Sequence, residues 1–219
     1  MKRQVTMEEI SDGRLYTAND MVRADCGGCE GCSACCRGMG QSLILDPLDA
    51  DRLAKGLERP FSDFLEKEVE LNVVDGVILP NMRMAGEGEG CAFLNSEGRC
   101  RVHAWRPGIC RMFPLGRYYE GRDFRYFLQV HECAKPNRSK VKVKNWLDTP
   151  NLKAYEAFVR DWHGFLKDLE EALKADPDPS YARNMNLYML NTFYMRPFRD
   201  AFYEEFSERL AQARDELGL

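Results

Sequence analysis

Five of the nine cysteines in this chain of 219 residues lie within eleven consecutive positions. The run reads Cys26-Gly-Gly-Cys29-Glu-Gly-Cys32-Ser-Ala-Cys35-Cys36. Because small residues separate thiols that stand three positions apart, the backbone can curl around one centre with the sulfurs pointing inward. If Cys35 is left out, the spacing is the C-x2-C-x2-C-x3-C of bacterial-type ferredoxins, although no proline follows the run. The run therefore predicts a site for a soft metal.

Cys35 and Cys36 are adjacent, and adjacent side chains diverge. We therefore expect one of them to face the main site and the other to face a second site or the core. The remaining cysteines form a looser second block, in which residues 95–98 predict a turn that brings Cys91 and Cys100 together. The last cysteine of the block, Cys133, follows much later.

The ligand count leaves the number of metal centres open. Without Cys26, eight cysteines remain, which is enough for two four-ligand centres. A single centre that takes three sulfurs from the first block and one from the second is equally consistent with the count. His103 lies near Cys100 and His131 near Cys133, so either imidazole could replace a sulfur in a mixed zinc site.

A disulfide framework is disfavoured as the alternative. Nine cysteines are an odd number, and residues 1–10 are polar and charged, without the apolar stretch of a secretory signal. We therefore expect a reducing, cytoplasmic setting, in which clustered cysteines are more often metal ligands or redox groups. The sequence contains no apolar run of membrane-spanning length, and a net charge of -4 argues against nucleic acid as a dominant partner.

Positive charges crowd the second cysteine block. Four thiolates around Zn²⁺ or an iron–sulfur cluster leave net negative charge, which nearby guanidinium groups offset while they tune a reduction potential. The same groups could instead hold an anionic substrate; we favour the first role because it follows from the ligands alone. The arginines concerned are Arg99, Arg101, Arg106 and Arg111, with Arg117 beside them.

Short strand and helix patterns fill most of the cysteine-bearing half. Asp46-Pro47 supplies an N-cap and a first-turn proline, and apolar residues then recur at helical spacing from Ala50 to Leu57. Asp75-Gly76 joins two β-rich runs and predicts a tight hairpin. The other expected elements are a short strand at 42–45, a short helix at 62–67, a flexible acidic loop at 86–90, strands at 115–119 and 124–130, and a lysine-bearing edge strand or solvated linker at 135–144.

From Thr149 onward, apolar residues follow a helical period up to residue 173, and two further helices are expected at 181–194 and 197–217. These stripes indicate core packing and not a cofactor site. The predicted fold is α+β, with a small cysteine-rich metal-binding domain of β-hairpins and short helices over residues 1–148. A C-terminal helical subdomain is expected over residues 149–219.

The cysteine pattern resembles the YkgJ-type cysteine-cluster family, which is described as a zinc- or iron-chelating domain. The resemblance covers about residues 26–133. It implies a bacterial or archaeal cytosolic protein that chelates metal through eight cysteines, and some relatives are flagellin lysine N-methylases thought to hold a 4Fe-4S cluster. Cys26 is additional to the family pattern. The matching segments are Cys29-x2-Cys32-x2-Cys35-Cys36, Cys91-x-Phe93-Leu94, Gly98-x-Cys100, Arg106-Pro107, Cys110-Arg111-x-Phe113-Pro114 and Cys133.

Two functions from different classes follow. The first is an iron–sulfur protein, with a 4Fe-4S centre, that transfers electrons or assists a modification such as methyl transfer to a protein substrate. The second is a zinc-stabilised, non-enzymatic binding or scaffold module that presents its helical tail to a protein partner. Enzymatic activity rests on the family analogy alone, since the C-x3-C-x2-C run of radical S-adenosylmethionine enzymes and a methyltransferase glycine motif are both absent. Thiol–disulfide chemistry is weaker, because the first run lacks the βαβ context of that motif.

Overall fold

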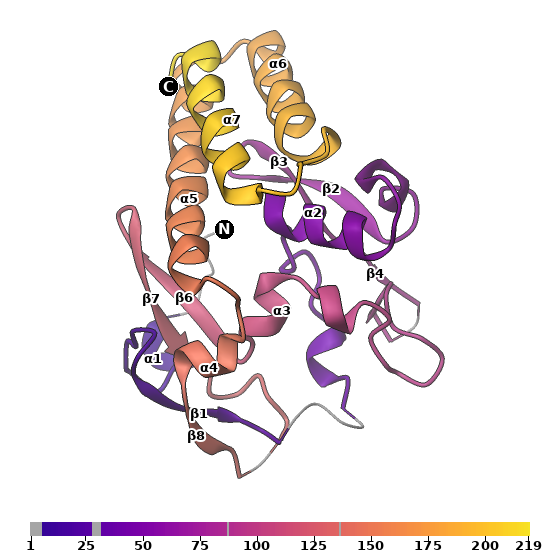
Figure 1. Ribbon diagram of the computed structural model, residues 1–219, viewed down its shortest axis with the longest axis vertical. Helices are drawn as coiled ribbons and strands as arrows, with labels where there is room; N and C mark the ends of the chain where they lie inside the picture. Colours follow the sequence, from indigo (N-terminus) through magenta and orange to yellow (C-terminus); the bar gives the residue numbers. More distant parts are fainter. Residues whose placement is uncertain (1–5, 28–31, 87, 136) are drawn as a thin grey trace. The chain divides into compact units, whose positions relative to one another are not determined.

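The computed structural model describes residues 6–27, 32–86, 88–135 and 137–219. It combines helices with two-stranded antiparallel sheets, so the expected α+β class is confirmed (Figure 1). The chain divides into two compact units, each made of two separate segments. The cysteine unit comprises Met1–Leu43 and Met84–Leu152, and the helical unit comprises Ile44–Arg83 and Lys153–Leu219. The domain boundary at residue 148 that the sequence suggested stays a prediction.

The cysteine unit contains three small sheets, in which β1 pairs with β8, β4 with β5, and β6 with β7. The strands predicted near 115 and 124 are confirmed, whereas β1 had no clear signal in the sequence. The elements are α1 (Met7–Ile10), β1 (Met21–Asp25), β4 (Met84–Ala85), β5 (Gly90–Cys91), α3 (Gly108–Met112), β6 (Leu115–Glu120), β7 (Asp123–Leu128), β8 (Ser139–Lys142) and α4 (Val143–Leu147), with 3-10 helices at Ala34–Cys36 and His103–Trp105.

The β6–β7 hairpin forms the framework of the cysteine unit. Its residue Tyr126 is buried and exchanges two backbone hydrogen bonds with Tyr16, of 2.7 and 2.9 Å, which adds the N-terminal segment as a short extra pairing. Gly116 lies directly opposite Phe127, and a Cβ at position 116 would approach the Phe127 ring to 2.5 Å. Glycine is therefore required at this position so that the ring can cover the strand.

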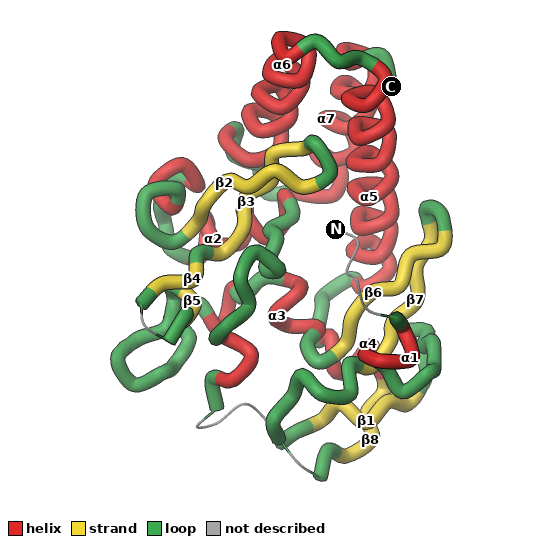
Figure 2. Tube along the Cα trace, turned by 180° about the vertical axis from the view of Figure 1, so that it is seen from behind, coloured by secondary structure: helices red, strands yellow, loops and turns green. Residues whose placement is uncertain are grey.

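The pairing of β1 with β8 joins distant parts of the cysteine unit. Met21 lies opposite Lys142 and Val22 opposite Val141, and the register shifts before Asp25 meets Ser139. The two strands lie side by side in both Figure 1 and Figure 2. For residues 139–142, the lysine-bearing edge strand that the sequence suggested is confirmed.

The helical unit combines α-helices with one hairpin, β2–β3. Helices α5, α6 and α7 lie side by side in both Figure 1 and Figure 2, and α6 contacts β3. Among the described residues, no helix has the length and apolar character needed to cross a membrane. The elements are α2 (Pro47–Gly56), a 3-10 helix (Phe61–Phe64), β2 (Val69–Val74), β3 (Val77–Met82), α5 (Leu152–Ala175), α6 (Pro179–Leu190), a π-helix (Asn191–Met195) and α7 (Phe202–Leu217).

Local signals placed several of these elements correctly. Asp46 caps α2 by accepting a hydrogen bond from the Asp49 N–H at 2.9 Å, with Pro47 in the first turn. The Asp75-Gly76 turn joins β2 to β3 as predicted, and both residues have positive φ, of 52° and 87°. The long helix expected after Thr149 is confirmed as α5.

Three expectations were wrong in detail. Residues 42–45 form no strand: Ile44 makes one bridge to Asn81, and the Leu45 N–H donates to the Pro80 carbonyl, but proline has no N–H to continue a ladder. The short helix near residue 62 is a 3-10 helix that begins at Phe61 and ends at Phe64. Helix α7 begins at Phe202 and not at 197, because the carbonyls of the preceding segment accept hydrogen bonds from Arg209.

Aromatic rings fill the core of the helical unit. Phe158 and Trp162 of α5 meet Phe206 of α7 with ring centroids 4.7 and 6.2 Å apart, and both pairs are close to edge-on. Phe193 of the π-helix packs 5.1 Å from Trp162. Edge-to-face pairs of this kind add to the stabilisation that comes from burying apolar area.

A buried amide ties α6 to the β2–β3 hairpin. Asn186 is 5 % exposed, and its Oδ1 accepts the Ile78 N–H at 2.6 Å. Its Nδ2 donates to the carbonyl oxygens of Gly76 and Ala182 at 3.3 and 2.9 Å. The amide thereby gives the Ile78 N–H and the Gly76 carbonyl, which lie at the turn, a hydrogen-bond partner on α6.

We expect Asn186→Ala to lower the free energy of unfolding by about 1–3 kcal/mol, because the variant loses the hydrogen bonds that join α6 to the Ile78 N–H and the Gly76 carbonyl. Urea denaturation monitored by far-UV circular dichroism measures this change. Asn184→Ala is the matched control, since Asn184 is exposed on the same helix. Equal stability of the two variants would contradict the role assigned to Asn186.

A buried ion pair connects α7 to the segment that precedes it. Arg209 is 3 % exposed and Glu205 is 5 % exposed, and their side chains meet at 2.5 Å. Arg209 also donates to the carbonyl oxygens of Thr192, Arg196 and Pro197 at 2.6–2.7 Å. Burial raises the pKa of Glu205, but hydrogen bonds from the Arg199 N–H and from the Arg209 and Arg199 side chains outweigh it and lower the pKa to about 2.

We expect Arg209→Met to destabilise the protein by about 3–5 kcal/mol, because it removes the buried partner of the Glu205 carboxylate and leaves Arg199 as its remaining charged partner. Since the pKa of Glu205 lies below its unfolded value of about 4.3, the stabilisation is complete above that pH and is lost as the pH falls toward 2. The free energy of unfolding of Glu205→Gln should therefore depend less on pH between about 4.5 and 2 than that of the wild type. An unchanged pH dependence would contradict this assignment.

Candidate metal centre

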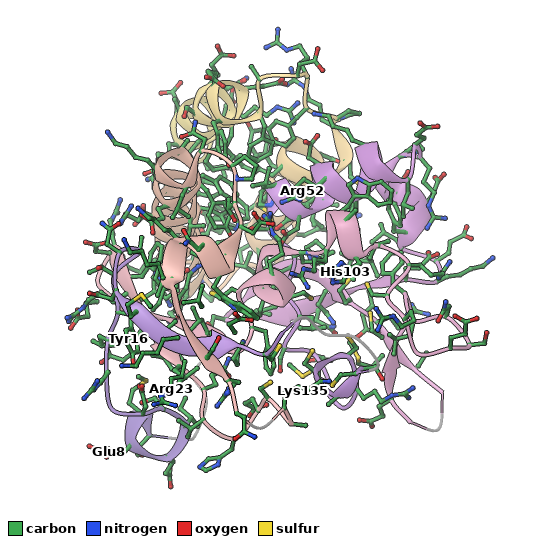
Figure 3. All side chains as sticks on the ribbon, turned by 60° about the horizontal axis from the view of Figure 1, so that its bottom comes forward. Glu8, Tyr16, Arg23, Arg52, His103 and Lys135 are labelled. Carbon is green, nitrogen blue, oxygen red and sulfur yellow. The ribbon has the colours of Figure 1, made fainter. Side chains whose placement is uncertain are left out.

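Four cysteine side chains line one pocket of the cysteine unit. Cys26 follows β1, Cys32 and Cys35 belong to the first run, and Cys133 lies between β7 and β8. We call this the cysteine pocket; its volume is about 20 Å³, enough for one water-sized occupant. Figure 3 shows sulfur atoms gathered in the part of the view where His103 and Lys135 are labelled. The remaining lining residues are Ala34, Phe113, Pro114, Glu132, Ala134, Lys135 and Trp146.

One wall of the cysteine pocket is apolar and held in place by hydrogen bonds. The Trp146 Nε1–H of α4 donates to the carbonyl oxygens of Met112 and Phe113 at 3.1 and 3.2 Å. This contact fixes the indole against the end of α3, next to Pro114. The thiols beside this wall are soft sulfur ligands, which Zn²⁺ and iron–sulfur clusters prefer. The sequence pointed to Phe113 and Pro114 through their motif, but it carried no signal for Trp146.

The thiols of Cys35 and Cys36 lie close together, although adjacent side chains were expected to diverge. They occupy a 3-10 helix, and a hydrogen bond between them is the main reason why the pKa of Cys35 is raised. Burial raises this pKa further, and the positive charge of Arg106 lowers it. Cys35 lines the cysteine pocket, whereas Cys36 does not.

The predicted turn brings Cys91 and Cys100 together. The Gly98 N–H donates to the Asn95 carbonyl at 2.9 Å, and Leu94 bridges Cys100. Cys91 is 8 % exposed; burial raises its pKa, and a hydrogen bond from the Phe93 N–H lowers it. The negative charge of Cys100 also raises the pKa of Cys91.

The first cysteine run lies beside this hairpin. Arg37 forms a bridge to Gly90, and the Gly38 N–H donates to the Glu89 carbonyl at 3.0 Å. A Cβ on Gly98 would lie 3.5 Å from the Ser33 Oγ. Cys36 is therefore followed by Arg37, which pairs with Gly90, the residue directly before Cys91. The two cysteine blocks, far apart in sequence, share one region of the cysteine unit.

The arginines of the second block differ in what they contact. Arg106 lowers the pKa of Cys35 and Arg101 lowers that of Cys91, so both positive charges act on thiols. Arg101 also donates to the Ala92 carbonyl at 3.0 Å. Arg111 is buried, and its Nη1 donates to the Asp148 carbonyl at 3.4 Å. The charge of Arg99 acts on His103.

Neither candidate histidine lines the cysteine pocket. The Nε2 of His103 lies 2.9 Å from the Arg106 Nη1 and accepts its hydrogen bond, since a guanidinium can only donate. Burial lowers the pKa of His103, and the charges of Arg106 and Arg99 lower it further. These surroundings favour the neutral form of the His103 imidazole. His131 is exposed.

The other predicted ligands are only partly placed. Cys110 lies half-buried in α3, and Cys29 lies outside the described residues. None of the eight cysteines that the structure describes takes part in a disulfide. Within the described ranges, no three His, Cys, Asp or Glu side chains are arranged so that they could hold a metal ion. Sequence reasoning left the role of Cys26 open, and the structure places it in the cysteine pocket.

Comparison with known proteins gives one family match. No curated protein and no solved structure matches the chain. The profile of the CxxCxxCC family, described as a putative zinc- or iron-chelating domain, matches residues 28–140. The matched residues include the later cysteines and the arginines beside them, and they exceed half of the chain. This agrees with the family expected from the sequence, and the chain therefore belongs to the CxxCxxCC family of zinc- or iron-chelating domains.

Proposed function

We propose that this protein holds an iron–sulfur centre of the 4Fe-4S type on its cysteines and uses it for electron transfer or to assist a modification such as methyl transfer. The observation that carries the proposal is the cysteine pocket, which is lined by thiols from two segments that lie far apart in the sequence. When bound, such a cluster supplies one-electron redox chemistry. The proposed ligands are Cys29, Cys32, Cys35, Cys36, Cys91, Cys100, Cys110 and Cys133.

The surroundings of the thiols support a centre with net negative charge. Arg106 acts on Cys35 and Arg101 acts on Cys91, so each block has a positive charge beside a proposed ligand. The Phe93 N–H also donates to the Cys91 sulfur. Positive charges and N–H groups near the sulfurs stabilise thiolates and tune the reduction potential of a cluster.

A zinc site is the second candidate, because thiolates are also the usual ligands of a structural Zn²⁺. Zinc would make the cysteine unit a structural module whose folding depends on metal. Its function would then be to bind a protein partner.

The proposed cluster also suggests a cellular location for the protein and the kind of molecule on which it acts. A cytoplasmic location suits an iron–sulfur centre because reducing conditions keep the thiols free to bind metal. The redox partner or modified substrate would be another protein, as in the methylase relatives of this family. Lysine methylation rests on that analogy alone, so the centre itself must be tested first.

Anaerobic purification followed by visible absorption and by analysis of iron, zinc and acid-labile sulfide identifies the centre. We expect brown protein with iron and sulfide in equal amounts. Colourless protein with stoichiometric zinc and no sulfide would overturn the iron–sulfur proposal in favour of the zinc module. Protein without either metal would overturn both.

We expect Cys32→Ser and Cys110→Ser each to lose bound metal and to unfold at lower temperature, because ligand loss removes the folding free energy that metal binding supplies. Metal content and thermal unfolding are measured on the same samples. Ser33→Ala is the control, since it changes the same run without removing a thiol. If both cysteine variants kept their full metal content, the proposed ligand set would be wrong.

We expect Arg106→Gln to make the reduction potential more negative, because the variant removes a positive charge that stabilises the reduced, more negative cluster. Redox titration monitored by visible absorption measures the shift. Arg122→Gln removes one positive charge from the turn between β6 and β7 and serves as the control. Equal potentials in the two variants would show that Arg106 does not act on the cluster.

A further inference from the structure

Strand β2 of the helical unit pairs with β3 along one edge, and its other edge carries exposed aliphatic side chains. Leu71 is 42 % exposed and Val73 is 69 % exposed. We propose that residues 70–74 of β2 pair edge to edge, antiparallel, with the same strand of a second copy of this chain. Pairing of this kind extends a sheet through main-chain hydrogen bonds. The inference is independent of the proposed metal centre and concerns the other unit of the chain.

The hydrogen bonds of the β2–β3 hairpin fix which backbone groups point outward. The Ile78 N–H donates to the Asn186 side chain of α6, so it points away from β2. Ile78 lies opposite Val73, and residue pairs along an antiparallel ladder alternate between hydrogen-bonded and non-hydrogen-bonded. The N–H and carbonyl groups of Val73, and those of Leu71 two positions earlier, therefore point out of the hairpin. Within the described part of the chain, no hydrogen bond reaches these groups.

Other strand edges of this chain are covered or charged. On the outer edge of β3, the Leu45 N–H donates to the Pro80 carbonyl at 2.8 Å, next to the bond between Ile78 and Asn186. Strand β8 carries lysines, which oppose unwanted pairing at an edge. Residues 71–74 of β2 read Leu-Asn-Val-Val and contain neither a charge nor a proline. This stretch of β2 therefore lacks the residues with which edge strands usually prevent pairing.

Burial decides the register of the proposed pair. Val69 is fully buried, so a second strand can reach β2 only beyond this residue. A two-fold axis at Asn72 places Leu71 of each copy opposite Val73 of the other, and both are hydrogen-bonded pairs. An axis at Leu71 would require pairing with the buried Val69. An axis at Val73 would set Leu71 against the carboxylate of Asp75.

The charges along this edge are compatible with a second copy. Glu70 is the one ionisable residue between positions 70 and 74. Its carboxylate lies 3.8 Å from the Arg83 Nε and accepts a hydrogen bond from the Asn72 amide at 3.1 Å. With the axis at Asn72, Glu70 faces Val74 of the other copy, so no two carboxylates oppose each other. Like charges directly opposite would destabilise the pair, and this register avoids them.

Sedimentation velocity of the full-length protein over a wide range of concentration tests the proposal. We expect a reversible equilibrium between monomer and dimer. Val73→Lys should raise the dissociation constant at least about tenfold, because it places a charge at the centre of the pairing. Leu187→Lys is the matched control, since Leu187 is 48 % exposed on α6 of the same unit, and it should leave the dissociation constant unchanged. A wild-type protein that stays monomeric at every concentration, or equal weakening by both variants, would overturn the proposal.

Hydrogen exchange separates strand pairing from any other mode of dimerisation. The amides of Leu71 and Val73 should exchange at least about tenfold more slowly at concentrations that favour the dimer, because they gain hydrogen-bond partners. The Asn72 amide points toward β3 and serves as the internal control, with a smaller change. A dimer in which the Leu71 and Val73 amides exchange as fast as in the monomer would overturn the proposal. Protection of these amides by a different protein, while the chain itself stays monomeric, would also overturn it.

Discussion

The antiparallel pairing of β1 with β8 is the contact on which the candidate centre depends. The strands lie more than a hundred residues apart in the chain; residue 26 directly follows β1, and residue 133 lies in the segment that leads into β8. Backbone hydrogen bonds and the contact between Asp25 and Ser139 close this long loop without help from a metal. Closing a loop of this length costs entropy, and a metal that bound thiols on both sides would stabilise the closed form further.

The surroundings of the thiols of Cys35 and Cys91 oppose their ionisation, so a bound cation would be needed to keep them as thiolates. Burial raises the pKa of Cys91, and a thiol–thiol hydrogen bond with burial raises that of Cys35. Arg101 and Arg106 oppose these effects, as does the N–H that donates to Cys91. The proteins of this family chelate zinc or iron, and such a metal binds thiolates, so it would displace these protons.

The helical unit is assembled from two segments that flank the second cysteine block. The two ends of its first segment, residues 44–83, lie close together. Ile44 bridges Asn81, and the Leu45 N–H donates to the Pro80 carbonyl. An inserted segment whose ends lie together leaves the surrounding fold undisturbed. Within the unit, Asn186 fastens this insert to α6, and Tyr194 donates a hydrogen bond of 2.9 Å to the Leu45 carbonyl.

The sequence alone determined the features that depend on local chemistry. The cap at Asp46, the Asp75-Gly76 hairpin and the turn between Cys91 and Cys100 follow from residues that are close in the chain, and the spacing of the cysteines identified the family. Only the tertiary structure decided which thiols share a pocket, because strand pairing between β1 and β8 and the contact of Trp146 with the end of α3 join residues that no local pattern connects. The same holds for the start of α7, where Arg209 takes the carbonyls that a longer helix would need. Hydrogen bonding between neighbours can be read from spacing, whereas packing between distant segments depends on the whole chain.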